Sequence, residues 1–163
     1  MPFNTVQVGP IPNGEPTRWS PAFSATGLTF TGENGTYPTY NSYYVKNGYM
    51  VTFWIKVDLN TVTNFGTGQF KLELPFTPHL GTANHFPGWV WRDPSVPADQ
   101  LNGHIILNVD HVSGDKTLDL HWVGATTADP KPVIEHLFYQ GWPIKLTTAS
   151  KIYVNGTYFT QEL

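Results

Sequence analysis

The sequence predicts an all-β protein: a jelly-roll-like antiparallel β-sandwich of eight to ten strands with an extended N-terminal arm. Short stretches of alternating apolar and polar residues recur at roughly even spacing, separated by Gly, Asn and Pro turns. No stretch keeps a helical apolar period over ten or more residues. Aromatic residues make up 15% of the chain, which favours strands. Long loops between the middle strands favour a jelly roll over an up-and-down barrel.

A β-hairpin over residues 43–58 is the clearest local prediction. Asn47-Gly48 separates two β-rich runs, and both residues tolerate the positive φ angles of a type I′ turn. Alternation along the second run predicts a core face made of Tyr49, Val51, Phe53, Ile55 and Val57. The opposite face places a tryptophan among polar neighbours, so we expect a subunit interface there, formed by Met50, Thr52, Trp54 and Lys56.

The same alternation predicts further strands along the chain. They lie near residues 28–30, 70–74, 89–91, 105–109 and 118–122. Residues 59–68 read as a loop rich in Thr, Asn and Gly. The segment 133–139 is compatible with a strand or one helical turn, and we favour a strand. A last hairpin is expected over 151–159, with Asn155-Gly156 at its turn.

The chain divides into a proline-rich arm, residues 1–18, and a β-sandwich domain, residues 19–163. Four prolines in the first segment exclude a helix or a central strand there. The alternatives are a disordered tail and an extended arm that docks on a neighbouring subunit.

Composition narrows the class of partner. Charged residues make up only 13% of the chain and the net charge is −3, so we expect no nucleic-acid partner, because no basic stripe exists to neutralise phosphates. The absence of cysteine excludes disulfides and thiol nucleophiles. No run approaches the roughly 18 apolar residues of a membrane span, and no secretory signal is recognisable. We therefore expect a protein made in the cytoplasm, without membrane insertion.

Neither catalysis nor a cofactor is predicted. The chain has no Gly-x-Ser-x-Gly motif, and nothing pairs Glu73 with Glu135 as glycosidase chemistry requires. Four side chains would approach one another if their strands pair: His104, Asp110, Asp119 and His121. A His/Asp cluster can bind a transition metal. No ligand spacing lies on one element, however, so we expect solvated or subunit-contacting histidines and no metal site.

Three tryptophans lie in or beside loops rich in Pro and Gly: Trp89, Trp91 and Trp142. Aromatic side chains stack on sugar faces and also anchor protein interfaces. These three are therefore candidates for a ligand or sugar contact, and the alternative is that they pack in the core.

The order of motifs resembles that of small virion proteins of tailed bacteriophages. The motifs are Trp19-Ser20-Pro21, the Tyr-rich strand and turn at 43–48, the strand that ends in Leu-Pro-Phe at 68–76, and the closing segment 152–158. The resemblance covers residues 19–158 in outline and carries no active-site signature. Such proteins look like jelly-roll trimers. They serve as capsid decoration or head-fibre proteins, or as receptor-binding modules at tail-fibre tips.

The resemblance implies a non-enzymatic, homotrimeric capsid decoration protein located in the virion. The sequence contains no coiled coil or fibre shaft, which favours a decoration protein over a long tail fibre. The expected partners are the major capsid protein or other virion proteins. Attachment would use apolar residues of the arm: Phe3, Val6, Val8 and Ile11. The alternative is a carbohydrate- or receptor-binding module of a tail fibre or spike, with a host-surface glycan as its partner.

Overall fold

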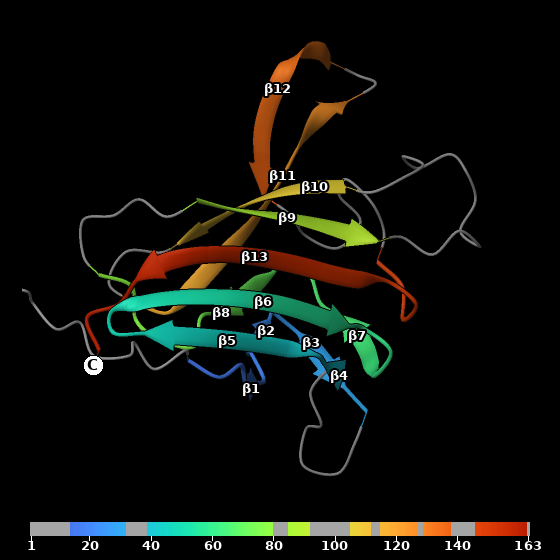
Figure 1. The fold of residues 1–163 in the computed structure, drawn as a ribbon. Helices are drawn as coiled ribbons and strands as arrows, with labels where there is room; N and C mark the ends of the chain where they lie inside the picture. The colour runs from blue at the N-terminus through green and yellow to red at the C-terminus, as the bar shows by residue number, and fades with distance from the viewer. Residues whose placement is uncertain are drawn as a thin grey trace, which may run out of the picture.

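The computed structural model of the chain describes residues 14–31, 39–79, 85–91, 105–111, 115–126, 129–137 and 146–162. Within these residues there are thirteen strands and no helix (Figure 1). The strands are β1 (Thr17–Trp19), β2 (Phe23–Ser24), β3 (Leu28–Phe30), β4 (Thr39–Tyr40), β5 (Ser42–Asn47), β6 (Met50–Asp58), β7 (Val62–Phe65), β8 (Lys71–Glu73), β9 (His85–Trp91), β10 (Ile105–His111), β11 (Thr117–Thr126), β12 (Asp129–Leu137) and β13 (Lys151–Phe159). The count exceeds the expected eight to ten because five of the strands have only two or three residues.

The architecture is an antiparallel β-sandwich, which confirms the predicted fold class. One sheet runs in the order β1-β5-β6-β13-β9-β10-β11-β8-β2, with β4 added beside β6 and β12 beside β11, and a second small sheet pairs β3 with β7. This strand order does not by itself establish a jelly roll, so that topology stays a prediction. Beyond the body, β11 and β12 extend as a two-stranded ribbon (Figure 1).

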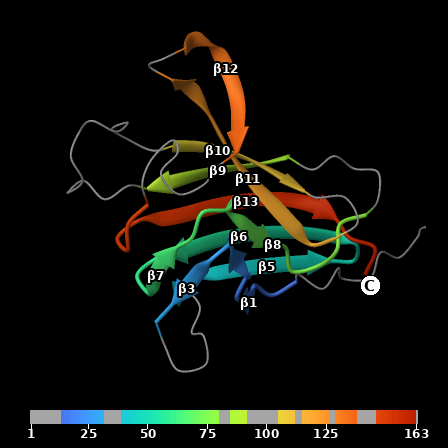
Figure 2. The ribbon, with the colours of Figure 1, turned by 180° about the vertical axis from the view of Figure 1, so that it is seen from behind.

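The large sheet folds over so that its two edges approach each other. Its edge strands, β1 and β2, are separated in sequence only by residues 20–22. Trp19 of β1 packs edge-on against Phe53 at a ring distance of 6.5 Å, and Phe23 of β2 stacks on Phe70 at 5.3 Å. Seen from behind, β8 lies in front of β6, so the two layers enclose the core (Figure 2).

Strand β6 is the central element of the first layer. It pairs with β5 on one side and along its whole length with β13 on the other, from Met50 opposite Phe159 to Asp58 opposite Lys151. Its inward side chains are fully buried, as predicted: Val51, Phe53, Ile55 and Val57. Tyr49, which the alternation also assigned to the core, is instead half-exposed, because it belongs to the turn before β6.

The β5–β6 hairpin forms as predicted, but its turn lies one residue later than expected. Asn47 pairs with Met50, so the two turn residues are Gly48 and Tyr49, and Gly48 has a φ of +58°. Asn47 has a different use. Its side-chain Oδ1 accepts a hydrogen bond of 3.0 Å from the backbone N–H of Gly14, which fixes Gly14 to the end of the hairpin.

No hairpin forms at Asn155-Gly156, and that prediction was wrong. Residues 151–159 run straight through as β13, with Gly156 opposite Phe53. A Cβ atom on Gly156 would lie 2.2 Å from Cδ1 of Phe86, and the Phe86 ring packs edge-on against Phe53 at 5.0 Å. Glycine is therefore required at this position to admit an aromatic ring into the core, and not to turn the chain.

Three other boundaries differ from or refine the expectations. The loop predicted at 59–68 contains β7, which pairs with β3. The strand favoured at 133–139 is present as β12, beginning earlier, at Asp129. The arm-to-domain boundary at 18/19 falls inside β1, which pairs with β5 at the sheet edge.

We predict that Gly156→Ala lowers the free energy of unfolding by about 1–3 kcal/mol, because the new methyl group must displace the Phe86 ring. Urea unfolding followed by tryptophan fluorescence measures the change. Gly48→Asn is the matched control, since nothing lies within 4 Å of its Cβ and Asn tolerates positive φ. Equal midpoints for Gly156→Ala and the wild type would contradict the packing argument.

Candidate functional site

The outward side chains of four adjacent strands form one continuous surface, here called the outer face. Cross-strand partners place each row: Tyr43 lies opposite Trp54, which lies opposite Asn155, and Lys56 lies opposite Tyr153, which lies opposite Trp89. The outer face consists of Tyr43, Val45, Asn47, Met50, Thr52, Trp54, Lys56, Asp58, Lys151, Tyr153, Asn155, Thr157, Phe159, Trp89 and Trp91.

One end of the outer face is apolar and open to solvent. Among the described residues, five large hydrophobic side chains are exposed, and all belong to this face or to the turn at its end. They are Tyr43 (36% exposed), Met50 (40%), Trp54 (48%), Tyr49 (50%) and Phe159 (57%). Large apolar side chains gathered on one surface mark a contact site more often than single exposed ones do.

The four residues predicted as a subunit interface share the outer face, but their surroundings differ. Met50 and Trp54 are exposed, whereas the Thr52 hydroxyl lies 3.0 Å from the hydroxyl of Thr157 on β13. Lys56 is engaged by Asp58, with Nζ 3.3 Å from Oδ2. The apolar contact surface is therefore centred on Met50 and Trp54, and Lys56 belongs to the charged end of the face.

Trp89 and Trp91 of β9 also lie on the outer face. Strand β13 lies between β9 and β6. The Trp89 ring stacks on Tyr153 with centroids 5.1 Å apart, and the Lys151 Nζ lies 5.4 Å from the centroid of Trp91. One face of each indole is thus covered by a β13 side chain, which leaves less ring surface for a sugar. Trp142 lies outside the described residues.

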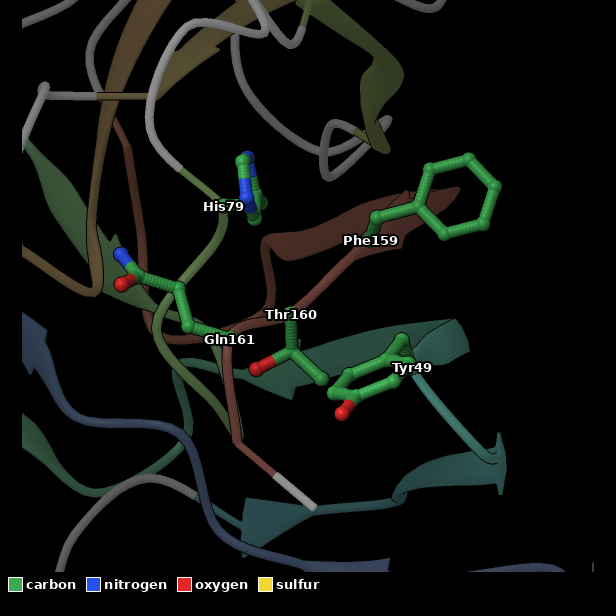
Figure 3. Close-up of a pocket in the computed structure, with 5 residues that line it drawn as sticks. All are labelled: Tyr49, His79, Phe159, Thr160 and Gln161. Carbon is green, nitrogen blue, oxygen red and sulfur yellow. The ribbon is translucent and has the colours of Figure 1, made fainter.

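A pocket of about 540 Å³ lies where the outer face ends. Tyr49, His79, Phe159, Thr160 and Gln161 line it. Figure 3 shows the Tyr49 and Phe159 rings on one side of Thr160, with His79 and Gln161 on the other. The sequence analysis did not find this pocket. Its only signal was an aromatic residue, Tyr49, at a turn position where the alternation predicted burial.

Backbone hydrogen bonds hold the walls of the pocket together. The Thr160 N–H donates to the carbonyl of Tyr49 (2.8 Å), and the His79 N–H donates to the carbonyl of Phe159 (2.7 Å). Thr160 is itself buried, and its hydroxyl donates to the carbonyl of Thr77 (2.8 Å). Three segments that are distant in sequence therefore meet in a fixed arrangement.

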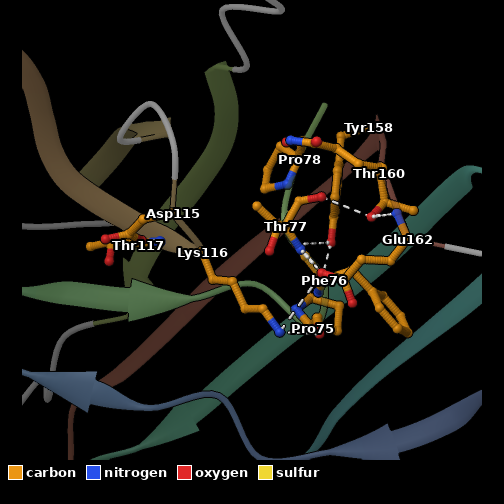
Figure 4. A network of polar contacts seen from close by, with 11 residues as sticks. Pro75, Phe76, Thr77, Pro78, Asp115, Lys116, Thr117, Tyr158, Thr160 and Glu162 are labelled. Atoms are coloured by element: carbon orange, nitrogen blue, oxygen red, sulfur yellow. Dashed lines mark hydrogen bonds and ion pairs between the residues drawn. The ribbon is translucent and has the colours of Figure 1, made fainter. Parts of the chain in front are cut away.

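A polar network behind the pocket fixes residues 75–78 to the C-terminal segment (Figure 4). The Tyr158 hydroxyl donates to the carbonyl of Phe76 (2.9 Å) and accepts from its N–H (3.2 Å), and burial raises the pKa of Tyr158 above its usual range. The Glu162 carboxylate accepts from the Thr77 N–H at 2.8 Å, and this bond lowers the pKa of Glu162. Lys116 adds a weaker attraction, with Nζ 4.0 Å from Oε1 of Glu162.

Three of the four residues considered as metal ligands, Asp110, Asp119 and His121, lie on two strands that do pair. Asp110 of β10 is opposite Asp119 of β11, and Asn108 is opposite His121. Asp119 forms an ion pair with Lys71, with Nζ 3.3 Å from Oδ1. His104 is outside the described residues. Within the described ranges, no three His, Asp or Glu side chains are grouped closely enough to hold a metal ion.

Two further findings concern attachment and membranes. The arm residues proposed for attachment, Phe3, Val6, Val8 and Ile11, lie outside the described residues. The part of the chain that the structure describes includes no helix with the length and hydropathy needed to cross a membrane.

Comparisons of the chain with protein-family models, with curated proteins and with solved structures find no match.

We predict that Glu162→Gln destabilises the protein at neutral pH and that this effect disappears in acid. The folded-state pKa of Glu162 is lowered from 4.5, so the carboxylate stabilises the fold above that pH and stops doing so as the pH falls through the folded-state value. Urea midpoints of both proteins, measured in steps from neutral pH downward, test this. A gap between them that does not change with pH would refute the role of the charge.

Proposed function

We propose that this protein is a non-enzymatic structural protein of a bacteriophage virion: a capsid decoration protein that acts as a homotrimer. The observation that carries the proposal is the apolar end of the outer face, where Tyr43 and Trp54 are exposed as cross-strand neighbours and Met50 is exposed on the same face of β6. The resemblance of residues 19–158 to small phage virion proteins supplies the biological setting.

A trimer contact centred on Tyr43 and Trp54 would remove this part of the apolar surface from water, and would leave Tyr49 and Phe159, at the end of the face, outside the contact. Tryptophan, tyrosine and methionine are enriched at protein interfaces, and charged residues are depleted at interface centres. Only 13% of the chain is charged, and the ion pairs of Asp58 with Lys56 and Lys151 lie at the opposite end of the face. In a cyclic trimer, three copies of one face can meet around the symmetry axis.

The surroundings of Trp89 and Trp91 support a protein contact over a sugar platform on the outer face. Carbohydrate stacking needs an open ring face, and β13 side chains cover one face of each indole. Attachment to the capsid would then rest on the arm, repeated three times per trimer, so that modest individual contacts add up through valency.

Trp54→Ala should break or weaken the trimer. Removal of a central interface tryptophan costs about 2 kcal/mol or more per contact, which weakens association roughly thirtyfold. Size-exclusion chromatography with light scattering measures the mass across a concentration series.

Trp91→Ala is the matched control, because its indole lies beneath Lys151 at the other end of the face, and it should keep the wild-type mass. A wild-type protein that runs as a monomer would overturn the trimer proposal. A Trp54→Ala protein with unchanged association would exclude the outer face as the interface.

Deletion of residues 1–13 should abolish capsid attachment and leave the trimer intact. The truncation retains Gly14, which bonds to Asn47, and β1, which completes the sheet edge, so the domain should fold as in the full chain. Co-sedimentation with purified capsids that lack the protein measures attachment. Equal binding by the truncated and full-length proteins would rule out the arm as the attachment element.

A further inference from the structure

We propose that the pocket lined by Tyr49, His79, Phe159, Thr160 and Gln161 binds a neutral saccharide, with a pyranose ring packed against the aromatic side of the pocket. Neither Trp89 nor Trp91 lines this site. It adds a ligand-binding role to a protein whose trimer contact is centred on Trp54.

The aromatic side of the pocket has ring surface available. Tyr49, in the turn before β6, is 50% exposed, and Phe159, at the end of β13, is 57% exposed. A pyranose presents C–H bonds on one face and hydroxyl groups around its rim, so its apolar face matches an aromatic ring. The volume of 540 Å³ is within the range of about 300–1,000 Å³ that is usual for small-molecule sites.

The other side of the pocket supplies neutral hydrogen-bonding groups. The Gln161 amide nitrogen donates to the carbonyl of Pro78 (3.2 Å), which holds the amide in place. The amide oxygen of Gln161 is an acceptor suited to a ligand hydroxyl group. Figure 3 shows Gln161 and His79 across Thr160 from the two rings. A ligand held there would meet apolar groups on one side and polar groups on the other.

The chemistry of the walls argues against two other ligand classes. A peptide strand would need open backbone groups, but the N–H groups of His79, Thr160 and Gln161 all bond to carbonyls within the walls. A phosphate or carboxylate ligand is held best by lysine or arginine, and neither is among the described residues that line the pocket, where His79 is the one side chain that can carry a positive charge. A neutral, hydroxyl-rich ring needs neither open backbone groups nor a cation.

The test is a glycan array followed by calorimetry. Full-length protein is applied to an array of neutral oligosaccharides built from glucose, galactose, mannose and rhamnose, with sialylated glycans as the charged comparison. The best-bound neutral oligosaccharide is then titrated, as a free monovalent ligand, into the wild type and three variants. We expect Tyr49→Ala and Gln161→Ala to weaken binding about tenfold, and Tyr49→Phe to retain most of the affinity.

Trp91→Ala is the matched control, since Trp91 is also an aromatic residue of the outer face but lies beneath Lys151 and does not line the pocket. It should bind the free oligosaccharide as the wild type does. Melting curves establish that each variant is folded, which is expected because Tyr49 and Gln161 are both exposed. The proposal is overturned if no neutral glycan binds, if only sialylated glycans bind, or if Trp91→Ala loses as much affinity as Tyr49→Ala.

Discussion

The pairing of β6 with β13 carries both the core and the candidate contact surfaces. Nine cross-strand pairs, from Met50–Phe159 to Asp58–Lys151, join the two strands without interruption. The inward half of these residues packs with Phe86 in the core, and Gly156 leaves the space that this ring occupies. The outward half forms the middle of the outer face. A register shift of one residue would reverse both surfaces together.

The outer face has two chemically different ends because its neighbours differ. Toward β9, Trp89 and Trp91 are engaged by Tyr153 and Lys151, and the ring surfaces are partly used within the molecule. Toward the β5–β6 turn, Trp54 and Met50 on β6 and Phe159 on β13 remain exposed. The first arrangement stabilises the sheet, since cross-strand aromatic pairs contribute a few tenths to about 1 kcal/mol each. The second leaves apolar surface for a partner.

Local alternation was sufficient to predict the fold class and most of the central strand. Burial of Val51, Phe53, Ile55 and Val57 follows from a period of two, which needs no knowledge of partners. The prediction of a turn at Asn155-Gly156 was wrong because the Asn-Gly signal is local. The glycine is needed there to make room for Phe86, a residue from a distant strand. The pocket was missed for the same reason, since hydrogen bonds between segments distant in sequence create it. The sequence also could not predict that Trp89 shares a face with the outward residues of β6, because that depends on β13 pairing between the two strands.

The position of β13 in the middle of the sheet has a consequence for how the molecule forms. Thr52 and Thr157, which face each other across β6 and β13, are 105 residues apart in the chain. Closing so long a loop costs entropy before any contact is gained, and topologies dominated by distant pairings fold slowly. Until residues 151–159 have been synthesised, one edge of β6 and its apolar side chains have no partner strand. The nascent β5–β6 hairpin is therefore exposed to aggregation during synthesis.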